Sequence, residues 1–422
     1  MFRESVRRRM DSVVEGKGKG DEGSTDHLPS IHGDDSLMSL HPARNWRVLK
    51  YILNSNDVYR LLGFVPVGIV VGVLDWNPTA VFVLNLLAIV PLAVLLSAVT
   101  EELSRNFSQS VGALLNATFG NALELIVSTV ALTRGEIRIV QANMLGAILS
   151  NLLLGLGSCF VLGGFRRDCQ FNATAAQTMG SLMVVASMSL VIPAALNMAF
   201  DHTTMTRSPN DILVLSRGTS IVLLILYIMW LYFQFQTHSR LFEQTNTSVD
   251  PGRVDVRKGK QEDALSPQAA VIALLTTTIV IAICAEYLVG TIDGLVHTLG
   301  INKIFVGLII LPLVGNAPEQ VTAVAAAAKN EVDLALGVAL GSSLQIALFV
   351  TPFLVVVGWI IDQPMSLCFE PFDAVVFFLS VLVVNSLIGD GETNYLEGAM
   401  LVGTYAIIAI SFYVYPENQN SF

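Results

Sequence analysis

The sequence predicts an all-α integral membrane protein with 11 transmembrane helices, and three observations lead to this fold class. The first is composition: 53% of the 422 residues are hydrophobic, 14% are charged, and the mean hydropathy is +0.62. A soluble chain of this size carries about 25% charged residues. The second is a series of apolar runs of about 20 residues, the length needed to cross a bilayer. The third is a short motif that occurs twice, 195 residues apart.

The order of polar and apolar segments divides the chain into tails, membrane segments and a linker. No apolar run follows the first basic cluster, so we expect a disordered cytoplasmic N-terminal tail rather than a cleaved signal peptide. The expected parts are this tail at 1–45, one extra transmembrane helix at 57–75, five helices at 78–236, a linker of mixed charge at 237–266, five further helices at 268–415 and a C-terminal tail at 416–422. The ten helices of the two sets are expected at about 78–100, 111–132, 137–164, 177–200, 212–236, 268–292, 302–328, 333–361, 371–389 and 394–415.

A repeat relates the two sets of five helices. The stretch Gly120-Asn121-Ala122-Leu123-Glu124 returns as Gly315-Asn316-Ala317-Pro318-Glu319, and the same offset of 195 residues aligns Leu145-Gly146 with Leu340-Gly341 in the following helix. A match that keeps its register across a loop indicates an internal duplication. Because each repeat has five spans, an odd number, the second repeat must enter the membrane from the opposite side. Inverted repeats of this kind place a substrate site near the midplane, at their interface.

The distribution of Lys and Arg predicts the orientation of the chain. With the N-terminus in the cytoplasm, 19 of the 24 basic residues fall on the cytoplasmic side and 5 fall on or near the opposite side. Cytoplasmic loops of membrane proteins carry such an excess of basic residues. We therefore expect a cytoplasmic N-terminus, a cytoplasmic linker, and a C-terminus on the far side of the membrane.

Glu124 and Glu319 are the candidate ion-binding residues. A carboxylate inside an apolar membrane segment is costly, rare and by default functional, although a buried structural hydrogen bond is the alternative interpretation. Asn121 and Asn316 lie three residues before the glutamates and share their helix faces, where each offers an amide oxygen or, alternatively, an interhelical hydrogen bond. Hard cations such as calcium take six to eight oxygen ligands, and buried, paired carboxylates also bind protons. Competition between a divalent cation and protons for these two glutamates is the chemistry of an antiporter.

Further polar and helix-breaking residues flank these four positions. The candidate polar shell, for which plain helix packing is the alternative, consists of Ser150, Asn151, Ser342, Ser343 and Gln345. Gly120 and Gly315 permit close helix approach and a local break in the helix. Pro318 lacks a backbone donor and so frees a carbonyl near Asn316 or one turn earlier. That carbonyl either coordinates the ion or belongs to a mere packing kink.

Other classes of protein fit the sequence less well. The four cysteines show no metal or disulfide spacing, so we expect no resident cofactor, and the net charge of −10 gives no sign of nucleic-acid binding. A cation channel usually builds its pore from symmetric subunits. An intramembrane hydrolase could use two acids, but the flanking Asn and Gly suit ion ligation better, so we expect a transporter and not an enzyme. No motif specifies the oligomeric state.

At these residues the sequence resembles the cation/proton exchanger (CAX) family, and the fungal vacuolar calcium/proton exchangers in particular. The resemblance is carried by Asn116–Leu125, Val140–Ala142, Ser150–Leu154, Gly341–Gln345 and Asp390–Glu392. It covers roughly residue 41 to the C-terminus. One position departs from the family. The second motif usually reads Gly-Asn-Ala-Ala-Glu-His, whereas Gln320 follows Glu319 here, and an amide cannot carry a proton.

The resemblance implies the fold of the cation/calcium exchanger superfamily, with one extra N-terminal helix and two inverted five-helix repeats. It implies that the chain lies in the vacuolar membrane with a lumenal C-terminus and exports cytosolic calcium in exchange for vacuolar protons. It also implies that Glu124 and Glu319 are the paired essential glutamates, and some members of the family move manganese or other divalent cations. A sodium-coupled or other divalent cation exchanger of the same fold is the alternative, and transport insensitive to protons would indicate it.

Overall fold

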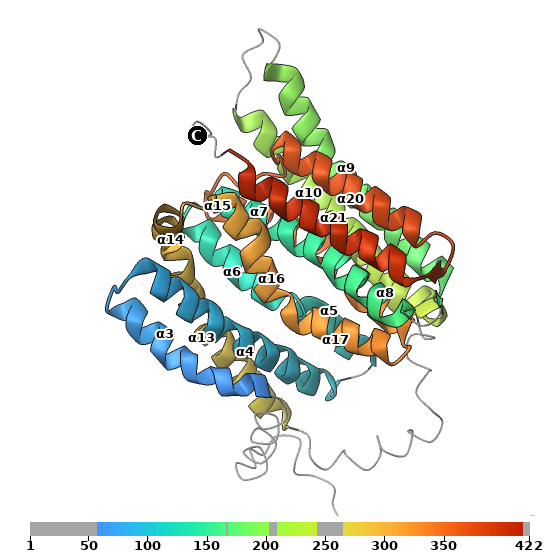
Figure 1. The fold of residues 1–422 in the computed structure, drawn as a ribbon, viewed down its shortest axis with the longest axis horizontal. Coiled ribbons are helices and arrows are strands. Elements are labelled where there is room, and N and C mark those ends of the chain that lie inside the picture. Colours follow the sequence, from blue (N-terminus) through green and yellow to red (C-terminus); the bar gives the residue numbers. More distant parts are fainter. Residues whose placement is uncertain (1–56, 108, 166–167, 202–208, 243–264, 417–422) are drawn as a thin grey trace, which may run out of the picture. The chain divides into compact units, whose positions relative to one another are not determined.

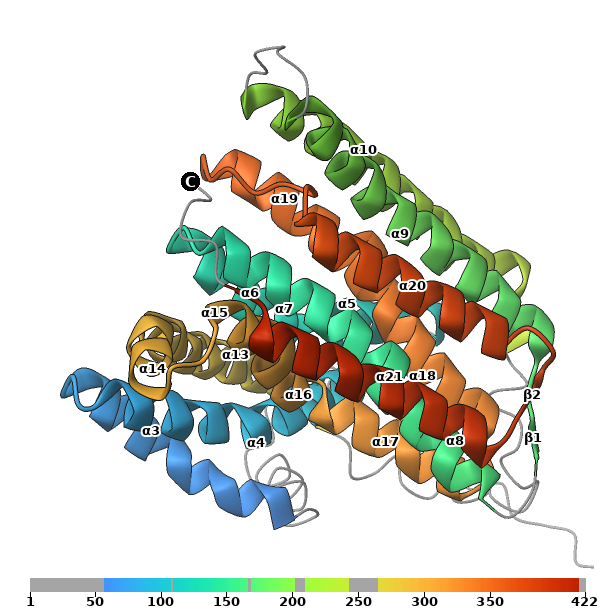
Figure 2. The same ribbon diagram turned by 45° about the horizontal axis from the view of Figure 1, so that its top comes forward.

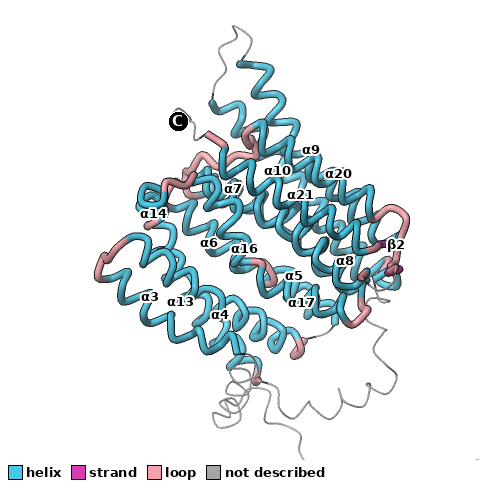
Figure 3. Tube along the Cα trace, in the orientation of Figure 1, coloured by secondary structure: helices cyan, strands magenta, loops and turns pink. Residues whose placement is uncertain are grey.

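The computed structural model describes residues 57–107, 109–165, 168–201, 209–242 and 265–416, and every structural statement below concerns these residues. The predicted N-terminal tail, most of the predicted linker and nearly all of the predicted C-terminal tail lie outside them. The described residues are almost entirely helical (Figure 1 and Figure 3).

Among these residues, seven helices have the length and apolar composition of a membrane span, or eight when one bent pair is taken as a single span. The long helices are α4 (Pro78–Ser104), α7 with α8 (Ile137–Leu149 and Leu156–Gly164), α9 (Ala173–Asp201), α10 (Pro209–Tyr232), α13 (Pro267–Gly290), α18 with α19 (Val332–Gln345 and Thr351–Ile360) and α21 (Tyr395–Val414). The shorter elements are η1 (Asp57–Gly63), α3 (Phe64–Val73), α5 (Gln109–Phe119), α6 (Ala122–Thr133), β1 (Cys169–Gln170), α14 (Ile292–Leu299), α15 (Lys303–Phe305), α16 (Leu311–Gly315), α17 (Ala317–Ala328), α20 (Pro371–Leu387) and β2 (Glu392–Thr393). The fold is that of a multi-pass helical membrane protein, as the composition predicted.

Local sequence explains where several of the long helices begin. Asn77 caps α4 by accepting a hydrogen bond from the backbone N–H of Thr79, and a proline follows in the first turn. Ser266 caps α13 in the same way, again with a proline in the first turn. The side chain of Asn394 accepts from two backbone N–H groups at the start of α21. Side-chain caps satisfy backbone donors that have no partner inside the helix, and proline at the first positions gives up no hydrogen bond.

Both copies of the sequence motif lie at a break in a helix. The predicted helix at 111–132 is divided into α5 and α6, with Gly120 and Asn121 between them. The predicted helix at 302–328 is divided between α16 and α17 at Asn316, and its two parts are bent by 54° relative to each other. The sequence predicted glycine-dependent breaks at these positions, and the structure has them.

The helices that follow each motif contain a π-helical segment. The segment η2 (Ser150–Gly155) joins α7 to α8, and η7 (Ile346–Val350) joins α18 to α19. The two segments end 195 residues apart, at Gly155 and Val350, which is the offset that relates the motifs. Two further π segments, η3 (Phe233–Thr237) and η6 (Val306–Ile310), extend α10 and precede α16. Short π segments inside α-helices are frequent at functional sites.

The packing of the helices encloses α7. In Figures 1 and 2, α3, α4 and α13 lie together on one side, and α9, α10 and α20 lie on the other. The residues of α7 from Ile139 to Leu149 are all buried. At one end of the bundle, strands β1 and β2 pair antiparallel, with Cys169 opposite Thr393, and so join the two halves of the chain. The motif helices α6 and α17 contact α7 and α18, respectively, so the site described below lies in the interior.

The two ends of the helices differ in their ion pairs. At the end that carries the turn between α6 and α7, Arg134 pairs with Glu286 (2.6 Å), and Arg138 pairs with Asp373 (3.0 Å). Lys303 also lies at this end, where it contacts Glu136 (2.8 Å) and Asp293 (2.7 Å). Most of these pairs join the first half of the chain to the second. At the other end, Arg105 pairs only with glutamates of its own helix turn.

Candidate cation-binding site

Each predicted glutamate lies in the first turn of the helix that follows its break. Glu124 is in the first turn of α6, and Glu319 is in the first turn of α17. The unpaired N–H groups and the dipole at a helix N-terminus favour negative charge. Each carboxylate therefore lies at the end of a helix where negative charge is favoured. Gly315, four residues before Glu319, lies beside Glu124 Oε1, so the second copy of the motif approaches the first glutamate.

Hydrogen bonds from three segments connect Glu319 to the first motif. The hydroxyl of Ser342 lies between Glu319 Oε2 and Asn121 Oδ1, the latter 3.1 Å away, and its single proton is shared between these two acceptors. The amide of Asn151 donates to Glu319 Oε2 at 3.5 Å. Asn121 in turn donates to Gln345 Oε1 at 2.6 Å. The structure therefore brings five of the predicted residues into one network that joins the two halves of the chain.

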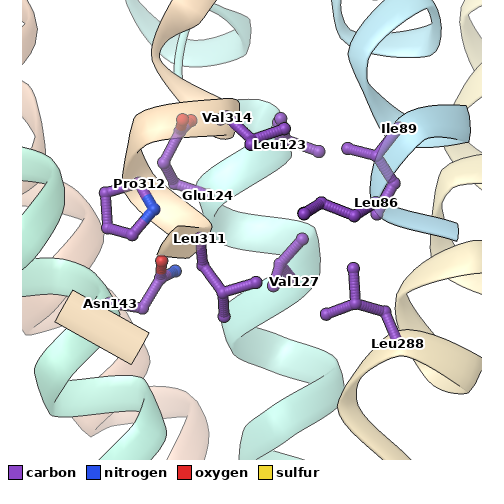
Figure 4. Close-up of a pocket in the computed structure, with 11 residues that line it drawn as sticks. Leu86, Ile89, Leu123, Glu124, Val127, Asn143, Leu288, Leu311, Pro312 and Val314 are labelled. Atoms are coloured by element: carbon purple, nitrogen blue, oxygen red, sulfur yellow. The ribbon is translucent and has the colours of Figure 1, made fainter. Parts of the chain in front are cut away.

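Glu124 has different surroundings. Its side chain is 6% exposed, and Oε2 is buried with no hydrogen-bond partner among the described residues. Oε1 lies so close to Gly315 that a Cβ there would be 3.3 Å away. A pocket opens beside the carboxylate, between α4, α6, α7, α13 and α16, and its remaining wall is almost entirely apolar (Figure 4). The second motif thus approaches Glu124 through a residue that has no side chain.

The other predicted residues have varied positions. Asn316 is fully buried; its amide donates to the Ala147 carbonyl at 2.9 Å, and its Oδ1 has no partner among the described residues. Ser150 accepts a hydrogen bond from Gln320 at 2.6 Å. Ser343 donates to the carbonyl of Ala339 in its own helix, so it has no bond to the network.

Gly120 and Pro318 both belong to the breaks. Gly120 closes the last turn of α5, with its N–H bonded to the Asn116 carbonyl at 2.8 Å. Pro318 occupies the first turn of α17, where the missing N–H would have no partner in the helix in any case. This position favours the structural interpretation of the proline, and the role of a freed carbonyl in coordination stays a prediction.

Two polar contacts were missed from the sequence. The first is the bond between Gln320 and Ser150, which links the residue after the second glutamate to the opposite half. The second is a buried pair in which Asn143 donates to Ser128 Oγ at 3.0 Å. Ser128 lies four residues after Glu124 and therefore on the same helix face, which is the signal that could have revealed it. The partner on α7 could not be found from spacing alone.

The ligands available at the site suit a hard cation. Among the residues that the structure describes, no group of three or more His, Cys, Asp or Glu side chains could hold a metal ion. The available ligands are two carboxylates with amide and hydroxyl oxygens, which is the hard oxygen chemistry that calcium prefers. Two carboxylates match the charge of one divalent cation.

Discontinuous helices whose broken ends meet at an interior site are typical of one class of membrane proteins, the secondary transporters. Comparison with known proteins is more specific. The family model of the sodium/calcium exchanger protein matches residues 77–236 and 269–414, and the chain belongs to that family.

Several curated proteins are similar over most of their length. A vacuolar calcium ion transporter of Schizosaccharomyces pombe is 47% identical over 369 residues, which are 87% of this chain and 87% of the relative. A Ca²⁺/H⁺ antiporter of Aphanothece halophytica is 40% identical over 86% of this chain and 98% of its own. These relatives confirm the resemblance to cation/proton exchangers that the motifs indicated.

Solved structures agree on the fold. The structure of native YfkE is similar with a TM-score of 0.70 and 33% identity, over 85% of this chain and all of that one. The H⁺/Ca²⁺ exchanger CAX is similar with a TM-score of 0.63 over 89% of both chains, and its 14% identity makes this a likeness of fold alone.

Proposed function

We propose that this chain is a secondary active antiporter that moves cytosolic calcium into the vacuole in exchange for protons. In this proposal the exchange proceeds by alternating access, with Glu124 and Glu319 binding the cation or protons in turn. The names of the relatives support calcium and protons as substrates, and the vacuolar names among them support the vacuolar membrane as the location. Manganese is a second candidate substrate, and sodium a second candidate coupling ion.

One observation carries the proposal. The two halves place a glutamate at corresponding helix breaks, and each glutamate contacts the opposite half: Ser342 links Glu319 to Asn121, and Gly315 lies beside Glu124 Oε1. An ion held by both glutamates would contact both halves of the chain. Movement of one half against the other would then change access to the ion without taking the site apart.

The proposed architecture has one extra helix and two inverted five-helix repeats. The eight candidate spans, counted with the bent pair, and the three shorter apolar helices near 58–73, 122–133 and 371–387 account for the segments that this topology needs, because α6 completes a span with α5. The proposed orientation has a cytoplasmic N-terminus and a lumenal C-terminus, supported by the excess of basic residues on the cytoplasmic side. We propose no enzymatic activity and no resident cofactor, only transported ions.

The test is calcium uptake into sealed, acid-inside vesicles that contain the protein. Uptake is measured with and without a protonophore, and with a sodium gradient in place of the pH gradient. Wild type is compared with Glu124→Gln and with Glu101→Gln, which changes an exposed glutamate paired within its own helix turn. We expect uptake to require the pH gradient, to vanish with Glu124→Gln and to persist with Glu101→Gln.

Each arm of this experiment has a distinct meaning. Uptake driven by sodium and unaffected by the protonophore would make the chain a sodium-coupled exchanger of the same fold. Normal transport by Glu124→Gln would remove the two-glutamate site from the mechanism. Competition of manganese against calcium in the same vesicles measures the preference between the two cations.

A further inference from the structure

The pocket beside Glu124 has a second polar side chain. Of the residues that line it, Glu124 and Asn143 are polar, and the others are apolar or glycine: Leu86, Ile89, Leu123, Val127, Leu288, Leu311, Pro312, Val314 and Gly315. Figure 4 shows Glu124 on one helix and Asn143 on the neighbouring one, on the same side of the pocket. An amide side chain in such a wall requires an explanation, because a buried polar group without partners is costly.

Ser128 fixes the orientation of this amide. Asn143 is 5% exposed and Ser128 is 1% exposed, and the Asn143 amide nitrogen donates to the serine hydroxyl at 3.0 Å. This bond uses the nitrogen of the amide. The carbonyl oxygen of Asn143 is therefore the atom left for a ligand in the pocket, and an Asn carbonyl is an ordinary ligand of calcium.

The pair occurs in one half of the chain only. At the offset of 195 residues that aligns the motifs, Ser128 corresponds to Ala323 and Asn143 corresponds to Val338. Both of these residues are apolar, and Ala323 is 1% exposed. The duplicated helices therefore pack without a polar pair in the second half, so the fold as such does not need one in the first.

The direction of α6 shows where the pair lies along the path of an ion. Glu124 is in the first turn of α6, Ser128 is one turn further, and the helix ends at Thr133 beside Arg134. Arg134 belongs to the end of the bundle with the ion pairs between halves. The pair thus lies between Glu124 and that end, which is the lumenal end in the proposed orientation.

We propose that Asn143, held by Ser128, is an additional cation ligand that the divalent ion contacts between Glu124 and the lumenal end. The inference rests on the proposed function. Asn143 gives its carbonyl oxygen to the ion, and Ser128 is a positioning residue that acts through Asn143. Access from the opposite end, past Glu319, does not involve this pair.

The experiment compares calcium affinity on the two sides of the same vesicles. Vacuolar vesicles of one orientation are used for KM of external calcium in uptake and for KM of internal calcium in efflux after loading. We expect Asn143→Leu to raise the internal KM about tenfold, the usual effect of losing one hydrogen bond or ligand to a charged group, with the external KM changed less than twofold. Ser128→Ala should raise the internal KM by a smaller factor and leave the external KM unchanged. Ser128→Thr, which keeps the hydroxyl, should have the wild-type internal KM.

A matched control separates this role from packing. Asn85 is also fully buried, but its amide donates to two backbone carbonyls, those of Gly68 and Val81. Asn85→Leu should alter protein level or both KM values alike. The proposal is overturned if Asn143→Leu behaves like Asn85→Leu, if it changes neither KM, or if it changes the external KM alone. If wild type carries another ion than calcium, the proposed function fails, and the same two-sided comparison with the ion that it does carry decides the role of Asn143.

Discussion

The surroundings of Glu319 and Glu124 differ although their sequence motifs match. Glu319 is half-buried and receives hydrogen bonds from Ser342 and Asn151. Glu124 is buried against Gly315, with one oxygen that has no partner among the described residues. The residues that correspond to Ser342 and Asn151 in the other half are Ala147 and Ile346, which have no side-chain donor.

Because of this difference, the negative charges of the two glutamates are stabilised in different ways. A carboxylate with hydrogen-bond donors is stabilised as an anion by the protein itself. A buried carboxylate with one oxygen unpaired is costly unless a cation or a proton neutralises it. In this conformation Glu124 therefore depends more on the transported ions than Glu319 does, and Glu319 depends more on side-chain donors of the protein. The duplication of a motif does not make its two copies equivalent.

The largest expected effect is that of Glu124→Gln and of Glu319→Gln. Each removes one of the two negative charges that balance a divalent cation, so we expect net exchange to fall more than about 100-fold in both, equivalent to a loss of roughly 3 kcal/mol or more in binding. Initial rates of calcium uptake in vesicles measure it. Exchange that survives in one variant and not in the other would contradict the two-glutamate site, because only one glutamate would then be needed to bind the ion.

Ser342→Ala should have the next largest effect. It removes the hydroxyl that contacts both Glu319 and Asn121, and so makes the second half resemble the first at this position. A hydrogen bond to a charged group contributes about 1.5–3 kcal/mol, so we expect KM for calcium to rise at least about tenfold. Ser343→Ala is the matched control, since Ser343 bonds only its own helix backbone in the structure. Equal effects of the two substitutions would contradict the assignment.

Gln345→Leu should have a moderate effect. Gln345 accepts a hydrogen bond from Asn121 across the two halves, with no charged partner. A bond between neutral groups contributes about 1 kcal/mol, which corresponds to about a fivefold change in KM. Gln320→Leu removes another side-chain amide hydrogen bond between the halves, the one to Ser150, and serves as the comparison. A change above about 100-fold for Gln345→Leu would indicate that its oxygen binds the ion directly.

Pro318→Ala should have the smallest effect. The corresponding residue in the first motif is Leu123, and that half makes its break without a proline. Pro318 lies in the first helical turn, where an N–H adds no bond within the helix. We expect less than about a threefold change in KM, which is under about 1 kcal/mol. A much larger change, measured in the same uptake assay, would favour the interpretation in which proline frees a carbonyl for the ion.

The sequence supplied most of the fold because membrane spans are long apolar runs. The helix expected at 137–164 begins where α7 begins and ends where α8 ends. The end of α20 lies within two residues of its expected position. The breaks at Gly120 and Gly315 followed from glycine within an apolar segment. Helix ends near polar residues were less accurate: α4 extends to Ser104 because Glu101 and Glu102 continue the helix instead of ending it.

The candidate site was predicted in its residues but not in its connections. The repeat gave Asn121, Glu124, Asn316 and Glu319, because polar residues in apolar runs are conspicuous. That Ser342 bonds across the halves while Ser343 does not depends on which helix face each presents, and two adjacent serines cannot be told apart by composition. Gln320 was noted only as a departure from the family, since its partner Ser150 is 170 positions away in the chain.

The two wide helical turns beside the site are the places where these spans can lose a residue. A π turn holds one residue more than an α turn uses, so Ser150–Gly155 and Ile346–Val350 each have a surplus residue in otherwise α-helical spans. Deletion of one residue from either turn would convert it to an ordinary α-helical turn. The helix before it and the helix after it would then keep the same residues facing the interior. The same loss within Ile139–Leu149 would turn every buried residue beyond it by about 100°.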